Sequence, residues 1–88
     1  MRKITILGNS EGTLFVNIDT NKGVDIYGGG DEIYLVINST SYEGEGGDGV
    51  FEISDGDFEY LYSKSQCINN TLRFHEEDPN YWVEFLIL

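Results

Sequence analysis

The chain has 88 residues and carries 16 acidic but only five basic side chains, which gives a formal net charge of −11. This length favours one small domain that spans residues 1–88. The negative charge argues against nucleic acid and anionic membranes as direct partners, because both repel an acidic protein. It favours a basic protein partner or a cation.

The sequence also predicts the compartment. Cys67 is the only cysteine, so no internal disulfide can form, and this usage is typical of a reducing interior. The apolar run 4–7 is too short for a signal peptide and is expected to be a strand. No run of residues approaches the roughly 20 apolar residues of a membrane span. We therefore expect a cytoplasmic protein without a membrane partner.

Apolar and polar residues alternate with the two-residue period of β-strands through most of the chain. Turn residues separate the alternating runs. The pattern predicts an all-β fold, a small antiparallel sandwich or barrel of about eight short strands. The C-terminal run is apolar on both faces except at Glu84, which is typical of a central strand, and we expect Trp82 in the core. The expected strands cover residues 4–7, 13–19, 24–27, 32–38, 50–54, 57–62, 72–74 and 81–88.

The segment 57–66 is ambiguous. As a strand it places three aromatic side chains on one face, whereas as a helix it groups Phe58 with Leu61. The dipeptide Asp55-Gly56 resembles a two-residue hairpin turn and favours the strand, and the aromatic content agrees. For residues 63–70 the sequence predicts a loop or one short helical turn. The glycine-rich acidic segment 44–49 is predicted to be a mobile loop.

The stretch 23–62 contains ten acidic residues, several interleaved tyrosines and no lysine or arginine. A charge run is most often a solvated face, but ordinary surfaces mix the two signs and this stretch does not. Tyrosine supplies rigid contact area at low entropy cost, so acids and tyrosines together indicate a recognition surface. The predicted partner-binding residues are Asp25, Tyr27, Glu32, Tyr34, Glu52, Asp55, Asp57 and Glu59.

These features predict a small acidic, non-enzymatic binding protein that inhibits a basic partner through an acidic, tyrosine-bearing face. In one version the acids mimic nucleic acid and occupy the basic groove of a nuclease or DNA-binding protein. At the level of general class, a short, acidic, single-cysteine β domain resembles the inhibitors made by phages and bacteria, such as immunity proteins and phage antagonists of host defence. The alternative hypothesis is a structural or assembly module that adds a strand edge to a neighbouring subunit.

Catalytic and metal-binding patterns are weak. Glu43, Glu45 and Asp48 offer oxygen ligands, but their spacing does not fit an EF-hand, and no metal or cofactor is predicted. His75, the only histidine, lies beside acids, and Cys67 is expected to be a buried or half-buried loop residue. The sequence contains no nucleophile elbow and no phosphate-binding loop before a helix. We therefore expect no enzymatic activity.

Overall fold

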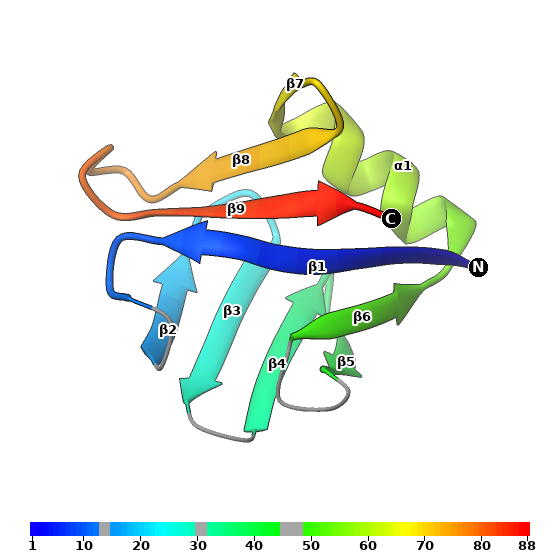
Figure 1. The fold of residues 1–88 in the computed structure, drawn as a ribbon, viewed down its shortest axis with the longest axis horizontal. Helices are drawn as coiled ribbons and strands as arrows, with labels where there is room; N and C mark the ends of the chain where they lie inside the picture. The colour runs from blue at the N-terminus through cyan, green and yellow to red at the C-terminus, as the bar shows by residue number, and fades with distance from the viewer. Residues whose placement is uncertain (13–14, 30–31, 45–48) are drawn as a thin grey trace.

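The computed structural model describes residues 1–12, 15–29, 32–44 and 49–88, and only the backbone of Phe15. In these ranges two antiparallel sheets face each other across a common core (Figure 1), with strand orders β6-β1-β9-β8-β7 and β2-β3-β4-β5. The predicted all-β fold is confirmed. The elements are β1 (Arg2–Asn9), β2 (Phe15–Asp19), β3 (Val24–Gly29), β4 (Glu32–Ile37), β5 (Thr40–Glu43), β6 (Val50–Ile53), α1 (Asp55–Lys64), β7 (Gln66–Ile68), β8 (Thr71–His75) and β9 (Trp82–Ile87).

The core forms because each strand turns its alternate aliphatic and aromatic residues inward. Phe85 lies at its centre, with edge-on contacts to Phe51 at 6.3 Å and to Phe74 at 6.0 Å between ring centroids. The fully buried side chains come from both sheets and from the helix. Burial of this apolar surface is the main driving force for folding.

Strand β9 lies between β1 and β8, so the prediction of a central strand is confirmed. The prediction that Trp82 lies in the core is wrong. Val83 and Phe85 occupy the inward positions of β9, and the alternation leaves Trp82 half-buried on the outer face. There the Arg73 guanidinium lies 4.5 Å from the centroid of the Trp82 ring.

The strand predicted for residues 57–62 is also wrong, because this segment lies in helix α1. Ser54 caps the helix: its hydroxyl accepts a hydrogen bond from the backbone N–H of Asp57 at 3.2 Å. Asp55 and Asp57 in the first turn are favourable at the positive end of the helix dipole. Phe58 and Leu61, three residues apart, bury one side of the helix.

Helix α1 lies across one end of the two sheets, near both chain termini (Figure 1). The Tyr60 hydroxyl donates a hydrogen bond of 2.6 Å to the carbonyl oxygen of Lys22 in the β2–β3 turn. The Tyr42 hydroxyl of β5 donates to the carboxylate of Asp57. These bonds tie the helix to the second sheet. Within the described residues, no helix is long and apolar enough to cross a membrane.

Two hairpins add strands that the sequence pattern did not predict. Asn38 and Ser39 both have positive φ and connect β4 to β5, while Asn69 and Asn70 connect β7 to β8 in the same way. Such two-residue turns match the twist of their strands. The loop or helical turn predicted for residues 63–70 is wrong for residues 66–68, which form β7, whereas residues 63–64 are the last residues of α1. The described residues contain nine strands rather than about eight.

Two sequence predictions fall partly outside the described residues. Residues 13–14 of the strand predicted for 13–19 lie outside the described residues, and so do residues 45–48 of the predicted acidic loop.

Candidate functional site

The outer face of the sheet β2-β3-β4-β5 gathers half of the predicted binding residues. On β3, Val24 and Ile26 are buried, so Asp25 and Tyr27 point outward. The same alternation on β4 turns Glu32 and Tyr34 outward. Two further acids on the neighbouring strands complete the group. We call it the acidic face, and it consists of Asp19, Asp25, Tyr27, Glu32, Tyr34 and Glu43.

The strand register fixes the order of these residues. Asn17, Tyr27, Tyr34 and Glu43 lie opposite one another in one row across the four strands. Asp19 lies opposite Asp25 in a second row, two residues away. Glu32 lies two residues from the tyrosine row on the other side, so carboxylates flank the tyrosines on both sides at about 7 Å along the strands.

Tyr27 and Tyr34 stack on each other. Their ring centroids are 5.2 Å apart and their planes are inclined by 18°. Tyr27 is 43% exposed, so the pair presents aromatic surface to solvent rather than to the core. A stacked cross-strand pair of this kind stabilises the sheet and holds both rings in a fixed orientation.

Glycine at position 28 permits this alignment. Gly28 has φ of +122°, which L side chains rarely adopt, and a Cβ there would lie 2.1 Å from the carbonyl oxygen of Glu32. Only glycine allows β3 and β4 to approach closely at this point. The pairing of Tyr27 with Tyr34 in the adjacent position depends on that approach.

Two residues of the acidic face have raised pKa values. Partial burial and then the Asp19 carboxylate raise the pKa of Asp25 above its ordinary value. The Glu32 and Glu43 carboxylates raise the pKa of Tyr34 in the same direction. In both cases the charged form of the group is disfavoured, mainly by burial at Asp25 and mainly by neighbouring carboxylates at Tyr34.

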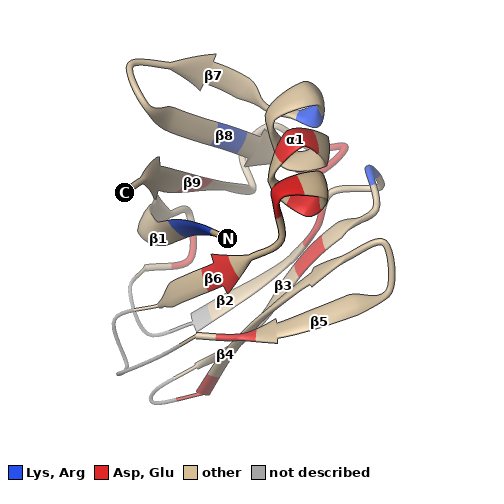
Figure 2. Ribbon diagram, turned by 90° about the vertical axis from the view of Figure 1, so that its right-hand side faces the viewer, with Lys and Arg blue, Asp and Glu red and all other residues tan. Residues whose placement is uncertain are grey.

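The basic residues lie elsewhere. Strands β2 to β5 contain no lysine or arginine, and β3, β4 and β5 carry acidic but no basic segments in Figure 2. Lys22 is half-buried in the turn between β2 and β3. Arg2 lies over the ring of Phe58, with 3.9 Å from its guanidinium carbon to the ring centroid. Among the described residues, neither ion pair of the structure involves the acidic face.

The other four predicted binding residues do not join this face. Glu52 is exposed on β6, opposite Lys3 of β1, and the remaining three lie on α1. Asp55 pairs with the N-terminal ammonium at 3.1 Å, and Asp57 accepts the hydrogen bond from Tyr42. Glu59 is exposed on the helix. The structure thus separates the sheet residues from a second group at the helical end.

Sequence reasoning omitted two members of the acidic face from the predicted site. Asp19 belongs to it because the turn 20–23 closes a hairpin that places Asp19 opposite Asp25. Glu43 belongs to it because the Asn38–Ser39 turn pairs β5 with β4. Both turns contain an asparagine with positive φ, and the Asn38-Ser39 pair is the sequence signal that could have revealed the pairing of β4 with β5.

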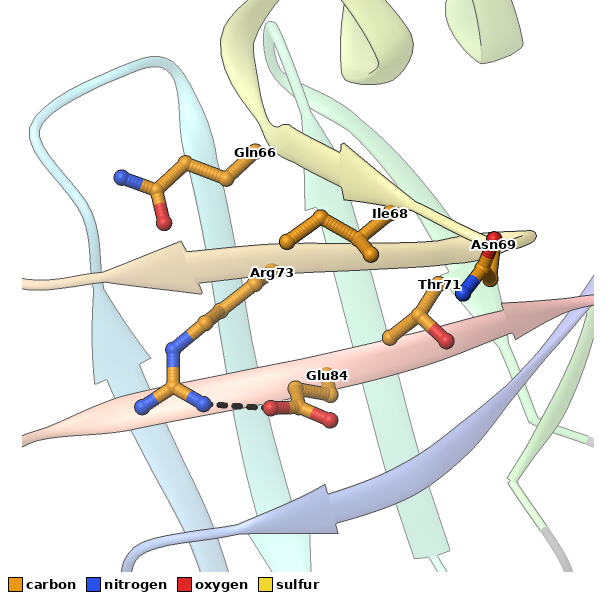
Figure 3. A pocket seen from close by; sticks show the side chains of 6 residues that line it. All are labelled: Gln66, Ile68, Asn69, Thr71, Arg73 and Glu84. Atoms are coloured by element: carbon orange, nitrogen blue, oxygen red, sulfur yellow. Dashed lines mark hydrogen bonds and ion pairs between the residues drawn. The ribbon is translucent and has the colours of Figure 1, made fainter.

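A concave region lies on the other sheet. A groove of about 350 Å³ opens beside the β7–β8 hairpin, and its lining residues come from β7, the β7–β8 turn, β8 and β9 (Figure 3). Arg73 and Glu84 form an ion pair in this groove. Its lining residues are Gln66, Ile68, Asn69, Thr71, Arg73 and Glu84.

Of the residues considered for catalysis or metal binding, Glu45 and Asp48 lie outside the described residues. Within the described ranges, no three histidine, cysteine or acidic side chains form a group that could hold a metal ion. The Nδ1 of His75 lies 2.7 Å from the carbonyl oxygen of Glu76. Cys67 is exposed on β7, so the prediction of a buried or half-buried loop residue is wrong.

No family model, curated protein or solved structure matches this chain. Its own residues and their arrangement are therefore the basis for inferring a function.

Proposed function

We propose that this protein is a small, non-enzymatic binding protein that captures a basic protein through the acidic face and blocks it. One observation carries the proposal. The stacked pair of Tyr27 and Tyr34 is partly exposed among four carboxylates, on a sheet whose strands contain no cation. A basic partner would supply the positive charge that this surface lacks.

Charge and aromatic surface would play different parts in the complex. The net charge of −11 and the single-sign face steer a basic partner toward the protein and accelerate association. The two tyrosines offer rigid surface of the type that dominates binding energy at protein interfaces. The carboxylates around them set the register by pairing with partner cations.

The inhibitor class we favour is the immunity-protein or phage-antagonist kind, acting on a nuclease or another nucleic-acid-binding protein. Such proteins carry dense basic grooves that attract phosphates. The acidic face spaces its rows at about 7 Å, wider than the roughly 3.4 Å between phosphates along a DNA strand. The acidic face therefore matches separate cationic side chains of a partner better than it mimics the phosphate row of DNA.

Strand-edge assembly is the alternative. Its best support is β7, an edge strand whose three residues are all exposed, with Ile68 at 70%. A strand of three residues offers few backbone hydrogen bonds to an added strand. The acidic face is therefore the better candidate for the binding surface. Salt separates the two hypotheses, since charge steering weakens with ionic strength and strand addition does not.

The test is a pull-down from lysate with the purified protein at about 0.1 M and about 1 M salt, where the screening length falls from about 10 to about 3 Å. The bait is compared with the double variant Asp25→Asn/Glu43→Gln. The control is Glu52→Gln/Glu59→Gln, which removes the same charge at exposed positions away from the acidic face.

We expect a basic partner that is held at low salt, released at high salt and lost with the face variant but not with the control. Equal capture at both salt concentrations would contradict the proposal. So would equal loss of binding in the two double variants, because the location of the charge would then not matter.

A further inference from the structure

We infer that the acidic face selects arginine, so that the partner contacts it through arginine side chains laid on the rings of Tyr27 and Tyr34. This inference rests on the proposed function and specifies the chemistry of the partner. Each guanidinium would lie against one ring and pair with a neighbouring carboxylate of the face.

The protein itself contains the arrangement that supports this inference. On β9 an aromatic residue and an acid, Trp82 and Glu84, are two residues apart on one outer face. Arg73 from the neighbouring strand β8 lies 4.5 Å from the Trp82 ring centroid and forms an ion pair with Glu84. In the register Arg73 is directly opposite Glu84 and diagonal to Trp82. One acid–aromatic pair thus holds one arginine.

The acidic face repeats this pair twice without the arginine. On β3, Asp25 and Tyr27 are two residues apart and point outward, and on β4 the same holds for Glu32 and Tyr34. The neighbouring strands β2 and β5 contain no arginine or lysine that could fill the diagonal position. The sheet therefore offers two acid–aromatic pairs, and an external cation can approach both from solvent.

Stacking occupies one ring face of each tyrosine, while Tyr27 is 43% exposed and Tyr34 is half-buried. Because the planes of Tyr27 and Tyr34 are inclined by only 18°, each ring covers one face of the other. By the register, the remaining face of Tyr27 is on the side of Asn17, and that of Tyr34 is on the side of Glu43. The carboxylates that raise the pKa of Tyr34, those of Glu32 and Glu43, are close enough to act on a bound cation.

Arginine fits this environment better than lysine. Its planar guanidinium stacks on an aromatic ring and still directs N–H groups to a carboxylate in the same plane. The lysine ammonium is a strongly hydrated point charge, which loses more hydration on an aromatic surface and cannot form a bidentate pair. A face of carboxylates alone would accept either cation, so discrimination depends on the two tyrosines.

Two peptides test the inference, (Arg-Ser)3 and (Lys-Ser)3. They have equal length and charge, and in an extended chain their cations recur every second residue, about 7 Å apart, as do the rows of the face. NMR titration of the intact protein at about 0.1 M salt measures both affinities. We expect the arginine peptide to bind about two- to fivefold tighter, since one cation–π contact at an exposed site contributes about 0.5–1 kcal/mol.

Tyr27→Leu should reduce the preference for the arginine peptide, because only the Tyr34 ring then remains to receive a guanidinium. Tyr81→Leu is the matched control, because Tyr81 is 45% exposed, like Tyr27 at 43%, but lies outside the face. If Tyr27→Leu does not fold, the comparison of the two peptides on the unmodified protein still decides.

Equal affinities for the two peptides would overturn the arginine inference and leave the proposed function in place. Absence of binding by both peptides would overturn both. An arginine preference that persists unchanged in Tyr27→Leu and Tyr81→Leu would overturn the assignment to this face.

Discussion

The outer faces of the two sheets both place acids beside aromatic rings, but one face also carries basic residues and the other does not. On the sheet that contains β8 and β9, Trp82 and Glu84 are covered by Arg73, and Lys3 lies opposite Glu52. On the sheet β2 to β5, the equivalent acids and aromatics have no basic residue on a neighbouring strand. On the first face the Glu84 carboxylate has a cationic partner within the chain, whereas among the described residues no ion pair involves the acidic face.

This difference explains why net charge alone is a poor guide to the site. The helical end of the molecule also carries several acids, but there the N-terminal ammonium, a tyrosine hydroxyl and the helix dipole interact with them. On the acidic face, Asp19 accepts a hydrogen bond from the backbone N–H of Asn21 at 3.0 Å, but among the described residues none of the four carboxylates takes part in an ion pair. A carboxylate that already pairs with a cation of its own chain is less available to a partner cation than a carboxylate without such a pair.

The largest effect is expected when an arginine is introduced into the acidic face by substitution. Asn17 is exposed on β2 directly opposite Tyr27, so Asn17→Arg places a guanidinium beside that ring and the acids of the neighbouring row. The introduced side chain should occupy the face and weaken binding of (Arg-Ser)3 by tenfold or more. It should also stabilise the protein by about 0.5 kcal/mol, as favourable cross-strand pairs do. NMR titration and urea unfolding measure the two effects.

Asn80→Arg is the matched control, because Asn80 is exposed in the turn before β9 and gains the same charge away from the face. Its effect on peptide binding should be a small, nonspecific reduction. Unchanged or tighter binding by Asn17→Arg would show that an arginine at that position does not compete with the peptide.

A smaller effect is expected when the arginine of the opposite face is removed. Arg73→Leu uncovers Trp82 and leaves Glu84 without its partner. We expect a loss of about 1 kcal/mol in the free energy of unfolding, because the Arg73 side chain is 38% exposed and solvent screens the pair. Urea unfolding measures it. Arg73→Lys should recover only part of the loss, and full recovery would show that charge alone stabilises this contact.

Most of the fold could be predicted from local alternation, whereas the helix could not be predicted by the same signal. Buried Ile26, Leu35 and Phe85 follow the two-residue period, and their strands were found. The Asp55-Gly56 pair resembled a hairpin, but Ser54 with Asp57 three residues later is a helix-capping sequence. Two local signals competed, and packing of Phe58 and Leu61 against the sheets favours the helix.

The candidate site was only partly predictable, because it depends on which strands are neighbours. Alternation correctly turned Asp25 and Glu32 outward, but it could not show that Glu52 lies on the opposite sheet. Glu43 was omitted because β5 is short and its two-residue turn was not recognised. Composition predicts how many acids exist, and only the register shows which of them share a face.

The smallest effect expected is a pH dependence that originates in one acid pair. The pKa of Asp25 is raised in the folded protein, by partial burial and then by Asp19, so the folded state retains this proton more strongly than the unfolded chain. The stability contribution of Asp25 is therefore highest at low pH and is lost as pH rises from the ordinary aspartate pKa of about 4 through the raised value.

Asp25→Asn should remove this decline and make the protein more stable at neutral pH, because Asp19 no longer faces a second charge. Urea midpoints of both proteins between about pH 3 and 7 measure the difference. A variant less stable than the original at neutral pH would mean that the Asp25 carboxylate has a cation close to it, and the contrast between the two faces would then fail at its central residue.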